Sequence, residues 1–555
     1  MTEAPDPVTV ALTGQLPFYL LLAGVFTWPI AIGLLRLYTR AVRRSMRMPT
    51  PAAISAIAIS PFETAPIEAG QGKPASPATL HDLPNAASSP EADMLLGRLT
   101  AQSRRAALVY AIGGGAYALV MASAHLLAGG LEILPVRFLF LFWVFVWPVV
   151  LTMTIVAVAT RPARFALTAA YFIGLSALGA VGMQSSPDLT WGQVFLLWIL
   201  SDLPPTILLM TYLSRRVRAV GPLVLTFMFL ALTGTGVAVS IGGSRVSYMR
   251  TIVNLAGLVG LGGTGAFVAL LAVGFLAFAA VGWVALAWIG RRYQAKKISD
   301  ETVTLDAIWM VFAIVHSIGL VFEHLLWALT SLVAFGAYKT CVRVGFSWLR
   351  RQHESSQKST TLLVLRSFSI GRDGERLFDV IDRLWRRVGS IQMIAGIDLA
   401  HRTVEPHEFL DFISGKLARR FIDGSATLEQ RLRERDMRPD RDLRFRVNDF
   451  FCYDDTWKMV LSRLVHESDA VLMDLRGFSR DNAGCVFELH ELVRLVPLDR
   501  VVFVVDRRTD ETLLAETLGD CRAGVYRLGS IDGRQLRQLL RALAAAAAPT
   551  PVVAA

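Results

Sequence analysis

The sequence predicts a polytopic α-helical membrane bundle followed by a C-terminal α/β domain of three layers with a mainly parallel sheet. Two observations predict the bundle. Hydrophobic residues make up 53% of the 555-residue chain and charged residues only 18%, and apolar segments long enough to cross a bilayer recur up to residue 346. One observation predicts the α/β domain: beyond residue 355, short apolar runs typical of buried strands alternate with helical patterns.

Residues 1–45 are expected to form an N-terminal transmembrane helix. Its apolar run is followed by a basic cluster of Arg36, Arg40, Arg43 and Arg44. Basic residues concentrate on the cytoplasmic side of membrane proteins, so we expect the N-terminus outside and this helix to exit into the cytoplasm. A cleaved signal peptide has the opposite charge layout. Residues 46–105 are rich in Pro, Ala and Ser, which predicts a disordered linker.

Residues 106–346 are expected to form a multi-pass transmembrane region. Their basic connections alternate along the chain with connections that carry no basic cluster, as expected when the basic side is cytoplasmic. The stretch 304–346 has about twice the length of one span. A tight hairpin near Glu323 and His324 is the simplest solution and gives about nine helices; a membrane-surface helix is the alternative. The six earlier spans are expected at about 106–128, 134–158, 164–183, 191–213, 218–241 and 264–290.

Asp202 lies near the middle of a predicted span, just before Pro204 and Pro205. A carboxylate in mid-membrane marks a candidate intramembrane site. The alternative is that the two prolines break the helix and that Asp202 caps the freed amides. His316 and Glu323 share one helix face and are a candidate pair. A small-solute transporter would rest on Asp202 alone, because the sequence shows no paired broken helices.

The stretch 469–492 organises the C-terminal domain, which we expect at 355–548. An apolar strand that contains Asp474 is followed by a polar loop with Arg476 and Ser479, and then by a helix that carries Glu488. Strand, loop and helix in this order build ligand crevices at the carboxyl ends of parallel strands. The earlier strand at 362–365 has a similar polar exit, formed by Arg366, Ser367 and Ser369.

The segment FSRDNAGCVFEL, Phe478 to Leu489, resembles the Ser, Cys and Glu-Leu box of TIR domains, with Gly484 where the family has Trp. With LRSF (365–368), DDTW (454–457) and LRGFS (475–479), it is similar to the TIR-like, flavodoxin-like domains of uncharacterised bacterial multi-pass membrane proteins. The resemblance covers about 355–530. It implies an inner-membrane protein in signalling or defence whose Glu488 cleaves the nicotinamide–ribose bond of NAD. Deoxyribosyltransferase-like domains share this layout and remain an alternative.

N-glycosidic cleavage needs a carboxylate near the ribose, and partial desolvation would raise the pKa of Glu488 and hold it in place. Arg366 and Arg476 are candidate phosphate donors. The remaining candidates for nucleotide binding are Ser367, Ser369, Asp474 and Ser479. In the structural alternative, Glu488 pairs with Arg476 or Arg366 and only pins a loop.

The sequence also limits cofactors and partners. Four widely spaced cysteines predict neither a zinc site nor a disulfide framework, so we expect no metal, and NAD only as a substrate. The net charge of +11 is interpreted as cytoplasmic loops beside the lipid bilayer and not as a nucleic-acid surface. Self-association through the C-terminal domain is expected. A module that signals without chemistry is the alternative to an enzyme.

Overall fold

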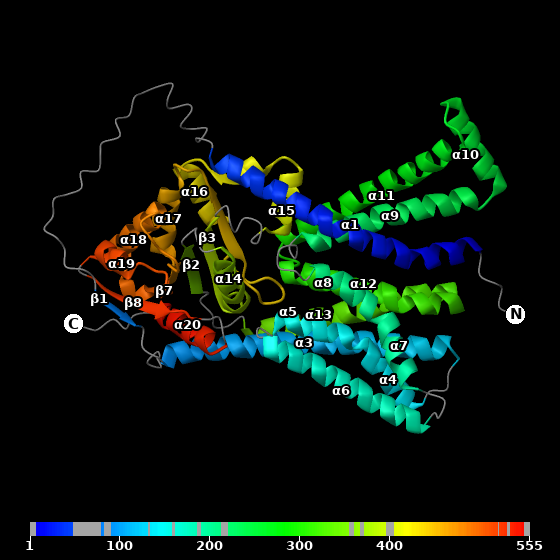
Figure 1. Ribbon diagram of the computed structural model, residues 1–555, viewed down its shortest axis with the longest axis horizontal. Helices are drawn as coiled ribbons and strands as arrows, with labels where there is room; N and C mark the ends of the chain where they lie inside the picture. Colours follow the sequence, from blue (N-terminus) through cyan, green and yellow to red (C-terminus); the bar gives the residue numbers. More distant parts are fainter. Residues whose placement is uncertain are drawn as a thin grey trace. The chain divides into compact units, whose positions relative to one another are not determined.

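The computed structural model divides into two compact units. The helical unit comprises Met1–Leu37, Ala106–Gln352 and Val404–Ile413, and the α/β unit comprises Tyr38–Arg105, His353–Thr403 and Ser414–Ala555. Figure 1 labels their elements. The structure describes residues 7–47, 79–82, 90–130, 134–157, 161–185, 190–212, 220–353, 360–366, 371–395, 404–519, 521–529 and 533–548.

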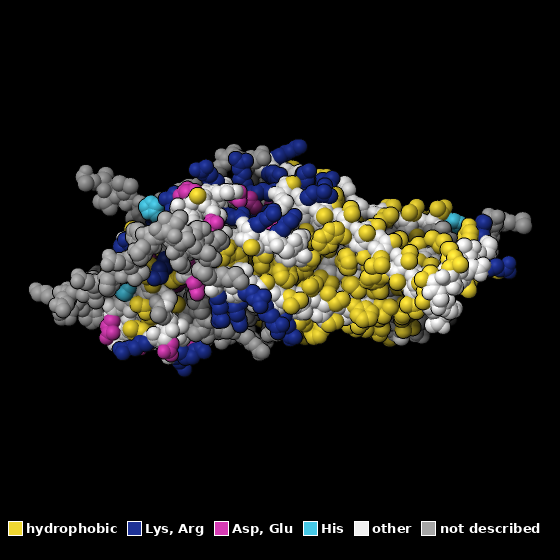
Figure 2. Space-filling model, turned by 90° about the horizontal axis from the view of Figure 1, so that it is seen from above, with side chains coloured by type: hydrophobic (Ala, Val, Ile, Leu, Met, Phe, Trp, Pro, Cys, Tyr) yellow, Lys and Arg dark blue, Asp and Glu magenta, His cyan; other side chains and the backbone are white. Residues whose placement is uncertain are grey.

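Long apolar helices form the helical unit. Within the described residues, seven of them are long and apolar enough to cross a membrane, or eight if the bent pair α7 and α8 is one span, which supports the predicted multi-pass membrane region. Figure 2 shows hydrophobic side chains gathered on the outer surface of these helices. The helices are α1 (Pro7–Met46), α3 (Pro90–Ala128), α4 (Pro135–Phe145), α5 (Trp147–Val156), α6 (Arg161–Ser185), α7 (Trp191–Ser201), α8 (Leu203–Tyr212), α9 (Gly221–Gly243), α10 (Val246–Leu258), α11 (Gly263–Gln294), α12 (Asp300–Glu323), α13 (Thr330–His353) and α15 (Pro406–Ile413).

The stretch 304–346 forms an antiparallel helical hairpin. Helix α12 ends at Glu323, and the chain turns through the short 3-10 helix η1 (Leu325–Leu329) into α13. Two contacts fix the register of the hairpin: the rings of Trp309 and Tyr338 stack 4.5 Å apart, and Lys339 Nζ lies 2.7 Å from Asp306 Oδ2. Helix α13 is not among the helices that qualify as spans by composition.

Two segments of the predicted linker are ordered, so the expectation of disorder across 46–105 is wrong for them. Strand β1 (Thr79–Asp82) pairs in parallel with β8 (Arg522–Arg527), and α3 begins at Pro90. Leu95 and Leu99 lie one helical turn apart and pack on the core of the α/β unit. A sheet edge offers unpaired backbone groups that a short strand satisfies. Residues 48–78 and 83–89 lie outside the described residues.

The sheet of the α/β unit is parallel at every described pairing, which confirms the predicted mainly parallel sheet. Its order is β1-β8-β7-β6-β2-β3-β5-β4. The chain moves from β2 to one side, through β3, and later returns to the other side at β6. The strand order therefore reverses between β2 and β6. The other strands are β2 (Thr360–Arg366), β3 (Gly389–Ile394), β4 (Phe421–Ile422), β5 (Val447–Cys452), β6 (Ala470–Asp474) and β7 (Val501–Val505).

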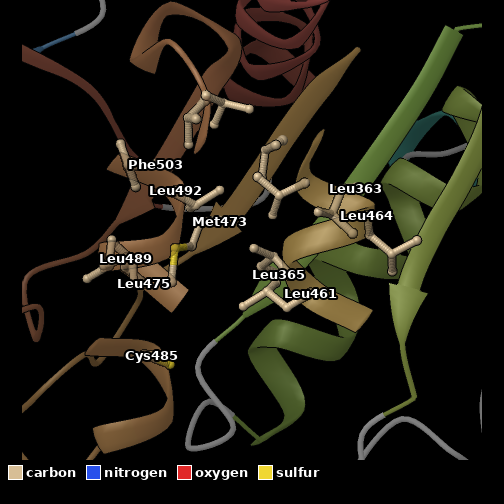
Figure 3. Close-up of a cluster of buried hydrophobic side chains, with 14 of the residues drawn as sticks. Leu363, Leu365, Leu461, Leu464, Met473, Leu475, Cys485, Leu489, Leu492 and Phe503 are labelled. Carbon is tan, nitrogen blue, oxygen red and sulfur yellow. The ribbon is translucent and has the colours of Figure 1, made fainter. Parts of the chain in front are cut away.

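Helices cover both faces of this sheet, as the three-layer prediction requires. One core contains Met473 and Phe503 of the sheet with Leu461, Leu489 and Leu492 of the helices (Figure 3). The other core places the helices α14 and α20 against the opposite face. The covering helices are α14 (Gly371–Trp385), α16 (Ser425–Arg433), α17 (Trp457–Glu467), α18 (Ala483–Leu495), α19 (Glu511–Leu518) and α20 (Gly533–Ala546).

Candidate functional site

The carboxyl ends of β2 and β6 define the candidate site in the α/β unit. The two strands run in parallel from Leu362 opposite Ala470 to Arg366 opposite Asp474. Ligands of doubly wound sheets bind outside the carboxyl ends of the strands, at the point where the strand order reverses. That point lies between Arg366 and Asp474. Ser367 and Ser369 lie outside the described residues, and the structure places only the backbone of Arg366.

Asp474 and Arg476 form a buried two-pronged ion pair at this point. Arg476 Nε donates to Asp474 Oδ1 at 2.8 Å, and Arg476 Nη2 donates to Oδ2 at 2.7 Å. Both residues are buried, with 3% of Asp474 and 4% of Arg476 exposed. The Arg476 amide donates to the same carboxylate at 3.3 Å. The pair therefore fixes the start of the loop between β6 and α18. The Arg476 guanidinium binds both carboxylate oxygens of Asp474.

Gly477 continues this loop with a left-handed backbone conformation, φ 70°. Its amide donates to Asp506 Oδ1 at 2.9 Å, and Thr509 Oγ1 donates to the Leu475 carbonyl at 2.9 Å. Partial burial acts to raise the pKa of Asp506, but hydrogen bonds from Arg508 and the Gly477 amide lower it from its ordinary value. The loops that follow β6 and β7 are thus tied together through an ionised carboxylate.

Ser479 lies further along the same loop. Its amide donates to Asn482 Oδ1 at 3.0 Å, and its hydroxyl is 3.3 Å from the same oxygen. This arrangement shapes the turn that leads into α18, which begins at Ala483. Ser479 is therefore a structural residue of the loop in this conformation, and its contact with a nucleotide stays a prediction.

Glu488 lies in α18 and is 4% exposed. Its Oε2 atom is buried and has no hydrogen-bond partner among the residues that the structure describes. Burial raises its pKa from 4.5 to about 8. The neighbouring Cys485 and Leu489 belong to the apolar core shown in Figure 3. At neutral pH the carboxyl group is therefore mostly protonated, inside a largely apolar environment.

The sequence-predicted residues whose side chains the structure describes in the α/β unit divide into two groups. Asp474, Arg476 and Ser479 share one loop at the carboxyl end of β6, whereas Glu488 lies on the following helix, as predicted. In the structural alternative, Glu488 pairs with Arg476 or Arg366. The structure pairs Arg476 with Asp474, and the side chain of Arg366 lies outside the described part. Asp506 and Thr509 were missed, although Asp506 follows the β7 strand directly, as a polar residue at a strand end.

The helical unit holds a second polar cluster, centred on Asp202. The predicted helix break is present: α7 ends at Ser201, α8 begins at Leu203, and the two are bent by 42°. Asp202 does not cap α8. Its Oδ1 lies 3.1 Å from His316 Nε2, and His316 Nδ1 lies 2.9 Å from the Tyr117 hydroxyl. His316 therefore contacts Asp202 and not Glu323, which is exposed at the end of α12.

A third cluster, Glu405, His407 and Glu408, brings together ligand atoms within 4.8 Å of one another. Its members already bind each other. His407 Nδ1 lies 3.3 Å from Glu405 Oε2, and Glu408 Oε2 accepts from the Glu405 amide at 3.2 Å. The last contact caps the start of α15, so the cluster is explained by helix capping.

Comparisons with known proteins identify no relative of this chain. No family model matches it, and no curated protein or solved structure does so either. The likeness to TIR domains therefore remains a resemblance of short motifs. The function has to be argued from the strand order, the loop at Asp474 and the environment of Glu488.

Proposed function

We propose that this chain is a polytopic membrane protein whose α/β unit binds NAD where the strand order reverses and hydrolyses its nicotinamide–ribose bond. The observation that carries the proposal is Glu488, a buried carboxyl without a hydrogen-bond partner on the helix that follows β6. A buried polar group without a partner is unfavourable for stability and clusters at functional sites. A nearby glutamate in the same helix, Glu491, is bound to Ser462 and Arg494 instead.

The strand order supports nucleotide binding. The strands β5, β3, β2, β6, β7 and β8 follow the doubly wound order 3-2-1-4-5-6, in which nucleotides bind at the reversal of strand order. Without β5, the other five strands keep the flavodoxin-like order 2-1-3-4-5. A TIR-like domain is the variant of this layout that the sequence motifs favour. In our proposal Arg366, at the end of β2, binds the pyrophosphate, because a guanidinium forms two parallel hydrogen bonds to phosphate oxygens. The Asp474–Arg476 ion pair fixes the loop after β6, which forms the other side of the proposed site.

The environment of Glu488 suits N-glycosidic cleavage. With a pKa of about 8, its carboxyl group can donate a hydrogen bond to a ribose hydroxyl at neutral pH. Once that proton has passed to the solvent, the carboxylate stabilises the positive charge that develops on the ribose in the transition state, and it regains a proton from the attacking water. Water adds to the anomeric carbon, and the carbon–nitrogen bond electrons return to the pyridinium ring. Nicotinamide, ADP-ribose and one proton are the products.

The arrangement of spans supports one membrane side for the whole α/β unit. Strand β1 lies between α1 and α3 in sequence, yet pairs with β8 near the C-terminus. An even number of crossings must therefore separate these two strands. With the bent pair α7 and α8 counted as one span, seven candidate spans lie between β1 and β8 in the described part of the chain. Seven is an odd number of crossings, so one more crossing is needed. Helix α13 supplies the eighth crossing, and the basic ends of α1, α11 and α13 then share the side of the α/β unit. By the positive-inside rule, we propose that this side is cytoplasmic.

Binding is tested by titrating NAD into the full chain held in lipid nanodiscs, with calorimetry as the readout. We expect saturable binding that Arg366→Ala weakens by about 1.5–3 kcal/mol, the range for hydrogen bonds to charged groups. Arg508→Ala is the matched control, because Arg508 is an exposed arginine in the neighbouring loop. Equal binding by both variants would remove Arg366 from the site, and no heat of binding with the unaltered protein would reject the proposal.

A further inference from the structure

The Asp202 cluster lies in the interior of the helical unit and joins three helices that are far apart in sequence. Asp202 is at the break between α7 and α8, His316 is in α12, and Tyr117 is in α3. All three residues are buried, and Asp202 is 0% exposed. Apolar rings enclose the contact: the ring of Phe145 lies 4.8 Å from that of His316, and the ring of Trp309 lies 5.0 Å from that of Tyr117.

When Asp202 is ionised, the donors and acceptors of the cluster fit one arrangement. A carboxylate only accepts hydrogen bonds, so His316 Nε2 carries the hydrogen that points to Asp202 Oδ1. The other nitrogen of a neutral imidazole is an acceptor, and it receives the hydrogen of the Tyr117 hydroxyl. This series of hydrogen bonds leaves one acceptor without a donor: Asp202 Oδ2 is buried and has no partner in the described part of the protein.

We infer that Asp202 Oδ2 is a proton-binding site inside the membrane bundle. An ionised carboxylate with one unpaired oxygen is highly unfavourable in a medium with little water, and one bound proton removes its charge. The position of Asp202 at a helix break also supports a proton-binding role. Discontinuous helices in membrane proteins commonly build ion and proton sites at the point of the break.

The other titratable groups around the cluster do not supply the missing positive charge. His125 of α3 interacts electrostatically with His316, and Tyr171 of α6 with Asp202. Lys339 of α13 is bound to Asp306. The helices α5, α7, α8 and α9 carry no acidic, basic or histidine side chain. Arg137 is the one charged side chain of α4, at the end of that helix opposite Phe145, and Glu323 is exposed at the end of α12.

Proton binding would act on the break itself. Asp202 is the C-cap residue of α7, and its carbonyl accepts from the Thr206 amide in α8 at 3.1 Å. Thr206 in turn accepts from Trp147 Nε1 of α5 at 2.7 Å. A change in charge at Asp202 therefore reaches the hydrogen bonds that hold α5, α8 and α12 together. This inference is independent of the proposed NAD chemistry.

Infrared difference spectroscopy of the full chain in lipid bilayers tests the site directly. Between alkaline and acidic buffer, we expect a protonated carboxyl band that moves on labelling with carbon-13 aspartate and disappears in Asp202→Asn. Asp306→Asn is the matched control, because Asp306 is a second carboxylate of the bundle but has a lysine partner, and it should leave the band in place.

Asp202→Glu covers the case in which Asp202→Asn does not fold. In that variant, made with carbon-13 aspartate, the band should persist but no longer respond to the label. A band that keeps its isotope shift in Asp202→Glu, or that survives in folded Asp202→Asn, would overturn the inference. So would an acid-induced histidine signal without any carboxyl band, because the proton would then reside on His316.

Discussion

Arg476 binds Asp474 across a single intervening residue, with Nε to Oδ1 at 2.8 Å and Nη2 to Oδ2 at 2.7 Å. Side chains two residues apart on an extended strand point in the same direction, but here the strand has already ended and the chain turns at Gly477. This buried pair stands at the reversal of strand order and holds the loop on which the proposed site depends.

Removing the guanidinium should destabilise the α/β unit strongly. Arg476→Ala leaves the Asp474 carboxylate buried and without its charged partner, which costs about 3–5 kcal/mol for buried pairs. We expect a lower midpoint in denaturant-induced unfolding, followed by tryptophan fluorescence of the full chain. Arg508→Ala removes an exposed arginine that binds Asp506 and should change stability by at most about 1 kcal/mol. Equal effects of the two variants would contradict the structural role of the Asp474 pair.

Glu488 should make the stability of the α/β unit depend on pH. Its pKa is raised from 4.5 to about 8, so the folded state holds a proton that the unfolded state has released. The contribution of Glu488 to the free energy of unfolding is therefore fully present below about pH 4.5. It is lost as the pH rises through about 8, and the total loss is roughly 5 kcal/mol. Unfolding midpoints measured from acidic to alkaline pH should show this fall, and Glu488→Gln should flatten it. A fall of the same size in both proteins would assign it to other groups.

Strand β1 should protect the edge of the sheet at β8. Leu80 packs partly against the core, so Leu80→Asp places a charge there and favours detachment of the strand. We expect the amides of residues 522–527 to exchange hydrogen about tenfold faster, the change that 1.4 kcal/mol produces. Asp82→Ala is the comparison: it removes only an exposed ion pair with Arg527 of β8, worth at most about 1 kcal/mol, and should change exchange less. Unchanged protection in Leu80→Asp would show that β8 does not need this partner.

Helix α13 should cross the membrane. In a protein freed of its four native cysteines, His324→Cys and His353→Cys should react with a membrane-impermeant maleimide from opposite sides of the bilayer. Gln294→Cys, at the end of α11, is the control and should react from the same side as His353→Cys. Reaction of His324→Cys and His353→Cys from one side would leave an odd number of crossings between β1 and β8, and the proposed topology would fail.

The local patterns of the sequence predicted the elements around the site. The apolar run at 470–475 and the helical spacing from Cys485 correspond to β6 and α18. Both patterns depend on neighbouring residues, because burial of a strand or of one helix face is visible in a short window. The placement of Asp474, Arg476 and Ser479 in one loop followed from the same reasoning.

Contacts between distant residues could not be predicted in this way. Asp202 and His316 belong to helices far apart in sequence, and β1 joins a sheet whose other strands begin at Thr360. The prediction of a disordered linker failed at β1 and the start of α3, because it used the average composition of 46–105. The order there depends on a few residues only: the four residues of β1, and Leu95 and Leu99, which pack on the core of the α/β unit. The lack of a partner for Glu488 is equally invisible in the sequence.

Release of nicotinamide from NAD by the full chain in lipid nanodiscs tests the central claim most directly. The comparison is between the unaltered protein, Glu488→Gln and Glu491→Gln, the last being a change of the nearby helix acid that binds Arg494. We predict turnover by the unaltered protein and by Glu491→Gln, and a loss of at least about a hundredfold in Glu488→Gln, as for other acid–base groups. Turnover that survives in Glu488→Gln, or no nicotinamide release by the unaltered protein even when it is clustered at high density, would contradict the claim.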